Sequence, residues 1–188
     1  YIKAKQKLKE FQYTDPQKLE EVLSNLVKEA SAFTDLKVTY IETLLDHVKI
    51  MEALRYIESE VAKEEKKNTE IYDYLCALAF YYDGNYQKAK LFIQKVLSQV
   101  NDNKKYTDLY KRIKEIDGLK NKANEVFKAG KYEDAINEYT TLLEYDPSNK
   151  KFNSIILANR ALCYQKLKRN EEALRDGNKC LEYNPNYA

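Results

Sequence analysis

Apolar residues recur at helical spacing along almost the whole chain. Segment 106–127 shows this well, because steps of three, four and one separate its apolar positions, as on one face of a helix: Tyr106, Leu109, Tyr110, Ile113, Ile116, Leu119, Ala123, Val126 and Phe127. Strict alternation of apolar and polar residues, which would indicate a strand, does not persist anywhere. Pro16, with Asp15 as N-cap, marks a helix start, and Pro147 and Pro185 follow helix ends. The pattern predicts an all-α protein.

A short motif, Gly-x-Tyr-x-x-Ala, occurs twice in the chain. Its two copies are Gly84, Tyr86, Ala89 and Gly130, Tyr132, Ala135. Two further markers share one offset, because 38 residues separate Ala135 from Ala173 and 38 residues separate Pro147 from Pro185. Equal spacing of independent markers indicates an internal repeat.

The repeated segments resemble the tetratricopeptide repeat, a helical hairpin of about 34 residues. Segments 116–149 and 154–187 match its pattern best, 70–103 matches without the final proline, 34–67 is degenerate and 15–33 is partial. The resemblance implies two antiparallel helices per repeat, with small residues where the helices meet and glycine at the turn, since a left-handed backbone costs glycine little. One hairpin cannot bury its own apolar face, so we expect the repeats to stack into a right-handed α-solenoid.

Twelve extra residues separate segments 70–103 and 116–149, because Ala89 and Ala135 are 46 residues apart. The extra residues keep the helical pattern, so 104–129 is predicted to be one helix of roughly 39 Å at about 1.5 Å per residue. Gly118 lies inside it, at a cost of about 1 kcal/mol relative to Ala, as a point where the helix could bend. We therefore predict an N-terminal array over 1–103, a helical linker over 104–115 and the start of a second array over 116–188.

Composition narrows the function classes. The formal net charge is +2 and no apolar run approaches the ~18 residues of a membrane span, so neither nucleic acid nor a membrane is an expected partner. Three unclustered cysteines, Cys76, Cys163 and Cys180, indicate reduced thiols and a cytoplasmic protein. The first residue is Tyr1 and not Met, so we expect a fragment. His47, the single histidine, lacks metal-ligand spacing to any acidic or cysteine partner and is interpreted as structural.

Three polar residues match the carboxylate clamp of chaperone-binding tetratricopeptide domains. Lys120 and Asn124 are four apart, hence on one helix face, at the fifth and ninth repeat positions, and Asn159 is at the sixth position of the next repeat. The resemblance implies that these residues grip the free C-terminus of heat-shock chaperones ending in Glu-Glu-Val-Asp, by charge-assisted hydrogen bonds. The family pattern adds a Lys and an Arg from a third repeat, which fall beyond Ala188.

The chain as a whole resembles the tetratricopeptide-containing J-domain co-chaperones. That resemblance rests on the degenerate repeats, the long linking helix and the segment 121–167, and it implies heat-shock chaperones of the seventy- and ninety-kilodalton classes as partners. No His-Pro-Asp motif, phosphate loop, nucleophile elbow or metal motif occurs, so we expect a non-enzymatic adaptor without a cofactor. Three alternatives remain open: an ordinary solvated groove at the three residues, a scaffold for another complex such as ciliary, mitotic or import machinery, and a regulatory arm of an enzyme.

Overall fold

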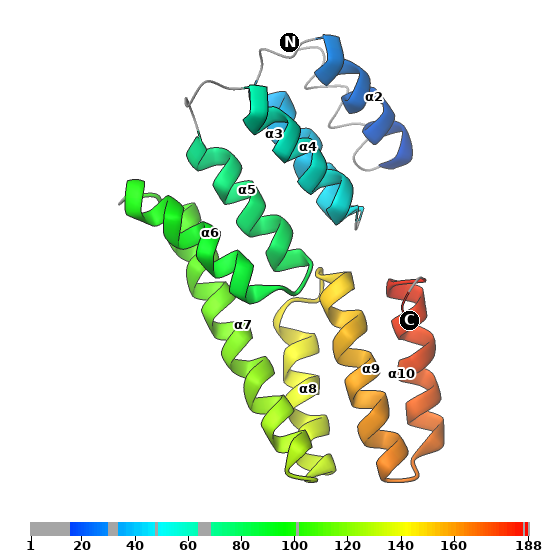
Figure 1. Cartoon of the computed structure of the whole chain (residues 1–188). Helices are drawn as coiled ribbons and strands as arrows, with labels where there is room; N and C mark the ends of the chain where they lie inside the picture. Colours follow the sequence, from blue (N-terminus) through cyan, green and yellow to red (C-terminus); the bar gives the residue numbers. More distant parts are fainter. Residues whose placement is uncertain are drawn as a thin grey trace. The chain divides into compact units, whose positions relative to one another are not determined.

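The computed structural model describes residues 16–29, 34–47, 49–63, 69–100, 102–185 and 187. Within these ranges the regular structure is entirely α-helical, which confirms the predicted fold class. Figure 1 shows the helices in chain order: α2 (Pro16–Glu29), α3 (Thr34–Asp46), α4 (Ile50–Lys63), α5 (Thr69–Tyr82), α6 (Tyr86–Gln99), α7 (Lys104–Lys128), α8 (Tyr132–Tyr145), α9 (Lys150–Lys166) and α10 (Asn170–Tyr183). Asp15, the expected cap of α2, lies outside the described residues.

The chain forms two compact units, residues 1–75 and 76–188, so the boundary falls inside α5. The division into arrays at 103 and 116 stays a prediction, because compactness and repeat register are different properties. In the first unit α3 contacts both α2 and α4. Its buried apolar cluster comprises Leu19, Leu23, Val27 and Leu36, with Val22, Leu26, Tyr40 and Tyr56 packed against it.

In the second unit each helix from α6 to α10 contacts the next one in the chain, as expected for stacked hairpins. Ala89, Ala135 and Ala173 are all buried, as the repeat register predicts. The turns of the first two hairpins have left-handed glycines, Gly84 (φ +76°) and Gly130 (φ +75°). The third turn differs, because Lys168 adopts φ +59° at the equivalent position. A non-glycine residue there is strained by about 1–2 kcal/mol.

The long helix predicted over 104–129 is present as α7, which is continuous from Lys104 to Lys128 with Ala129 as its C-cap. The side chain of Asn103 caps its start by accepting a hydrogen bond from the Lys105 amide at 3.0 Å. Gly118 is exposed, and the helix continues through it without a break. Linker and repeat are therefore one element, about 37 Å long at 1.5 Å per residue.

The turn between α5 and α6 packs against the turn between α8 and α9. The Tyr81 hydroxyl donates to Asp146 Oδ2 (2.5 Å), and Asn149 Nδ2 donates to the Tyr81 carbonyl (3.3 Å). Lys151 Nζ forms an ion pair with Asp83 Oδ1 (2.7 Å). These contacts join residues 65 to 68 positions apart and place the α5–α6 turn next to the residues considered below.

Candidate functional site

Lys120 lies on α7 and is half-buried against the preceding hairpin. Its Nζ is 5.4 Å from the centroid of the Tyr86 ring, a cation–π contact. The two residues line a hollow together with Asp83, Gly84, Asn85, Gln87, Asp117 and Asn121. None of the described carboxylates lies within ion-pair distance of Lys120. Its ammonium donors are therefore available to an external carboxylate.

Asn124 lies one helical turn beyond Lys120. Its Oδ1 accepts a hydrogen bond from the Tyr139 hydroxyl at 2.9 Å. Burial raises the pKa of Tyr139 to about 12, so this phenol is a protonated donor near neutral pH. The bond uses the oxygen of the amide, and no described residue accepts a hydrogen bond from the Nδ2 group. Asn124 is thus oriented as a donor, which is the function that a carboxylate clamp requires.

Asn159 lies on α9 and is half-buried. Among the residues that the structure describes, none forms a hydrogen bond with its side chain. Each guanidinium nitrogen of the adjacent Arg160 has a partner, because the group donates to both Asp176 oxygens (2.7 and 2.8 Å) and to Thr140 Oγ1 (2.8 Å). The convergence of Lys120, Asn124 and Asn159 on one peptide terminus stays a prediction.

Sequence reasoning missed the residues that surround Lys120. Tyr86 belongs to the repeat motif, and the sequence does not show which residues it meets. Its buried ring contacts Lys120 on one helix and Phe152 on another, and 5.4 Å separates the centroids of the Tyr86 and Phe152 rings. The Asp83–Lys151 pair had no signal in the sequence either, because 68 residues separate its members.

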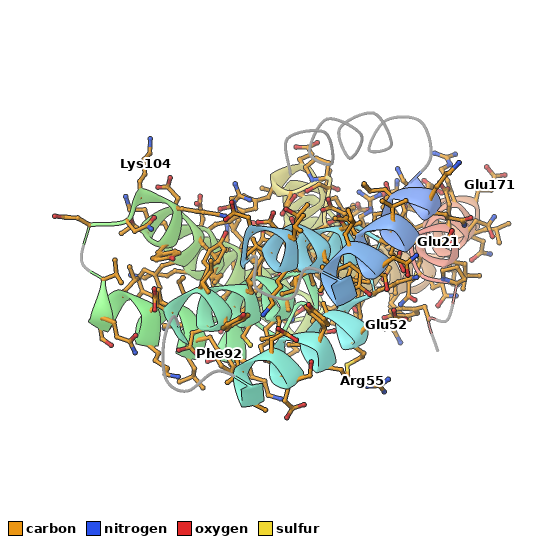
Figure 2. The ribbon with its side chains drawn as sticks, turned by 90° about the horizontal axis from the view of Figure 1, so that it is seen from above. Glu21, Glu52, Arg55, Phe92, Lys104 and Glu171 are labelled. Carbon is orange, nitrogen blue, oxygen red and sulfur yellow. The ribbon has the colours of Figure 1, made fainter. Side chains whose placement is uncertain are left out.

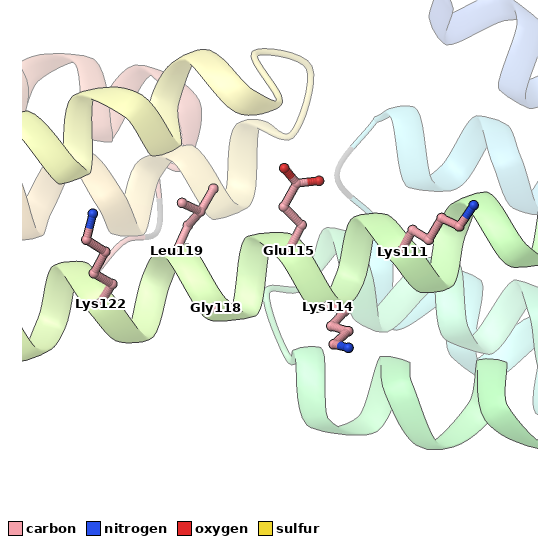
Figure 3. Close-up of a pocket in the computed structure, with 6 residues that line it drawn as sticks. All are labelled: Lys111, Lys114, Glu115, Gly118, Leu119 and Lys122. Carbon is pink, nitrogen blue, oxygen red and sulfur yellow. The ribbon is translucent and has the colours of Figure 1, made fainter.

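A second hollow lies along the exposed surface of α7 (Figure 3), lined by Lys111, Lys114, Glu115, Gly118, Leu119 and Lys122. Two of its charges are already occupied: Lys122 pairs with Glu138 (2.7 Å), and Glu115 accepts from the Tyr145 hydroxyl (2.8 Å). In Figure 3 Lys114 points away from Leu119 and Glu115, to the other side of the helix. This surface includes none of the clamp residues and is a solvated helix face. Other charged side chains, such as Lys104 and Glu171, likewise project from their helices in Figure 2.

His47 makes a structural contact within the first unit, in line with its interpretation as a structural residue. Its Nδ1 lies 2.8 Å from Glu20 Oε2, and Lys49 Nζ lies 2.5 Å from Glu20 Oε1, so the histidine has an acidic partner from α2. Within the described residues no cluster of three or more His, Cys, Asp or Glu side chains could hold a metal ion. His47 therefore joins the end of α3 to α2 through its hydrogen bond with Glu20.

Two of the cysteines, Cys163 and Cys180, are buried free thiols, and burial raises the pKa of Cys163 to about 11. Such thiols are poor nucleophiles near neutral pH. Among the described helices none combines the length and the apolar character needed to cross a membrane.

Comparison with known proteins identifies the class. Residues 154–187 match the family model of the tetratricopeptide repeat. The structure resembles the crystal structure of the tetratricopeptide domain of P58(IPK), with a TM-score of 0.66 at 18% identity, over 96% of this chain and 51% of that one. The described residues therefore have the all-α solenoid fold of tetratricopeptide-repeat domains.

Sequence relatives are more specific. The chain is 32% identical over 137 residues to the DnaJ homolog subfamily C member 7 homolog of Schizosaccharomyces pombe, which covers 73% of this chain and 29% of that protein. It is 39% identical over 72 residues to the Hsp70-Hsp90 organizing protein 1 of Glycine max, which covers 38% of this chain and 12% of that protein. The chain spans about a third of the length of the DnaJ-type relatives it matches.

Proposed function

We propose that this chain is a non-enzymatic, cytoplasmic adaptor that binds the free C-terminal tails of heat-shock chaperones. Lys120, Asn124 and Asn159 are the proposed peptide-binding residues. The observation that carries the proposal is the orientation of Asn124, because Tyr139 donates to its amide oxygen while no described residue accepts from its amide N–H groups. The names of the relatives support the partner class, since one is a DnaJ homologue and another is an organising protein for Hsp70 and Hsp90.

The chemistry follows from the donors. A peptide ending in Asp presents two carboxylates, and Lys120 supplies the charge while the two asparagine amides supply directed N–H groups. Charge-assisted hydrogen bonds contribute about 1.5–3 kcal/mol each. The family clamp also uses two cationic residues of a third repeat. Without these two residues the binding free energy is weaker by roughly 3–6 kcal/mol, which lowers the affinity by a factor on the order of 10²–10⁴. We therefore expect these 188 residues to bind the peptide weakly.

The test is a titration of the chain into a Glu-Glu-Val-Asp peptide that carries fluorescein at its N-terminus, followed by anisotropy. Lys120→Ala should weaken binding about 10- to 100-fold, from the loss of one charge-assisted bond. Lys128→Ala is the matched control, because it removes an equal charge from an exposed position in the last turn of the same helix. Salt should reduce the difference between the two variants.

Amidation of the peptide's C-terminus should weaken binding in parallel with Lys120→Ala, because it removes one carboxylate. If free and amidated peptides bind equally well, the clamp proposal is wrong and the scaffold alternative replaces it. The same conclusion follows if Lys120→Ala and Lys128→Ala bind alike.

A further inference from the structure

Residues 83–87 comprise the turn between α5 and α6 and the first two residues of α6, and they are called the α5–α6 turn below. This turn contacts both helices that carry the proposed clamp. On α7 the Tyr86 ring meets Lys120, and Gln87 Nε2 donates to Asp117 Oδ2 at 3.3 Å. On α9 Asp83 pairs with Lys151 at 2.7 Å. The turn is therefore a bridge between α7 and α9.

Helical spacing shows where the bridge lies along the two helices. On α9 a Cβ placed on Gly84 would be 3.6 Å from Phe152 and 3.7 Å from Ile155, so the space between Gly84 and these side chains is about that of one methyl group. Asn159 is four residues beyond Ile155, and Asn124 is four residues beyond Lys120, so each asparagine lies one helical turn further along the same face. The turn thus lies beside the first residue of each pair, Lys120 of the pair 120 and 124 on α7 and Ile155 of the pair 155 and 159 on α9.

The backbone of this turn is held firmly. Gly84 is buried with φ +76°, a conformation that L side chains rarely adopt. Tyr81, just before it, is hydrogen-bonded to Asp146, and Tyr86, just after it, packs on Phe152. A surface fixed on both sides can act as a steric boundary for a bound peptide.

We propose that residues 83–87 form the end wall of the peptide groove and that the Asp83–Lys151 ion pair keeps this wall neutral beside Lys120. The inference rests on the proposed function. The wall leaves room for a chain that ends at Lys120 and blocks one that continues, so it favours a free, acidic C-terminus. Without Lys151, the Asp83 carboxylate becomes an uncompensated negative charge next to the incoming carboxylates.

The experiment compares Lys151→Ala with Lys150→Ala in the 188-residue chain, using the same fluorescein-labelled Glu-Glu-Val-Asp peptide. Both variants remove one positive charge from the first turn of α9, but Lys150 is exposed and pairs with no described residue. We expect Lys151→Ala to bind on the order of 3- to 10-fold more weakly than Lys150→Ala at low salt. The double variant Asp83→Asn/Lys151→Ala should recover the affinity of Lys150→Ala.

The double variant separates charge from structure, because it also lacks the ion pair. If the pair acted only by stabilising the turn, the double variant would bind as weakly as Lys151→Ala, and the neutral-wall proposal would be wrong. Equal binding by Lys150→Ala and Lys151→Ala would also overturn it. If instead Lys120→Ala leaves binding unchanged, the proposed function itself fails, and the wall fails with it.

Amide shifts in ¹⁵N spectra give an independent readout. Peptide binding should shift the Gly84 and Gln87 amides together with that of Lys120, while amides of α10 stay in place. Shifts at Lys120 without shifts at Gly84 and Gln87 would retain the clamp and exclude the wall.

Discussion

Replacing Tyr81 with Phe tests how strongly the α5–α6 turn is held to the rest of the second unit. The Tyr81 hydroxyl donates to Asp146 Oδ2 at 2.5 Å, and both side chains are buried. Burial and this bond raise the pKa of Tyr81, so the phenol stays a donor near neutral pH. Hydrogen bonds to charged groups contribute about 1.5–3 kcal/mol, and Tyr81→Phe leaves the buried carboxylate oxygen without that donor.

The expected loss is therefore about 1.5–3 kcal/mol of unfolding free energy. At a urea slope of about 2 kcal/mol per molar, the midpoint should fall by roughly 0.7–1.5 M. The chain forms two compact units, which can unfold in separate transitions. Unfolding should therefore be followed both by circular dichroism and by hydrogen exchange of the α9 amides, which reports on the second unit.

Tyr145→Phe is the matched control. Its hydroxyl donates to Glu115 at 2.8 Å in an exposed position, so its removal should cost less than about 1 kcal/mol. Equal midpoints for the two variants, or unchanged exchange in α9 of Tyr81→Phe, would refute the idea that the buried bond holds the two turns together.

Two further predictions follow from local geometry and charge. Lys168→Gly should raise stability by about 0.5–1 kcal/mol, because relief of the left-handed backbone exceeds the added entropy of the unfolded chain; a lower urea midpoint would contradict the assigned strain. Burial alone would raise the pKa of Glu20, but hydrogen bonds from Lys49 and His47 outweigh that effect and lower the pKa below its usual 4.5. The Glu20 carboxylate therefore stabilises the first unit above about pH 4.5, and this contribution is lost as the pH falls. Glu20→Gln should therefore destabilise α2 near neutral pH and converge with the parent chain on acidification, as followed by hydrogen exchange and circular dichroism between pH 3 and 7.

The fold could be predicted from the sequence because short-range interactions determine most of it. Helical spacing and the alanine positions depend on contacts within one hairpin, so they could be read without knowing where the hairpins lie. The glycine turns at Gly84 and Gly130 follow from the same short-range physics. Lys168 shows the limit of that approach, because packing of α9 on α10 imposes the left-handed turn on a residue that does not prefer it.

The sequence predicted which polar residues could bind a peptide, but it did not predict which side chains surround them. Repeat position alone singled out Lys120 and Asn124, since residues four apart share a helix face. Their partners, Tyr86 and Tyr139, lie 34 and 15 residues away, and Glu20 lies 27 residues from His47. Such pairs depend on how helices are placed against each other, and no motif in one segment encodes that placement.

The length of the linker explains why the α5–α6 turn reaches Lys120. Helix α6 has 14 residues and contacts α7, and Gln87, at its start, bonds Asp117. At 1.5 Å per residue α6 spans about 21 Å, and the stretch from Lys104 to Lys120 spans about 24 Å. The two lengths match, so an antiparallel α6 that leaves its C-terminus near Lys104 must place its first turn beside Lys120. The twelve inserted residues supply most of that stretch, and their number therefore determines which residues stand at the start of the proposed groove.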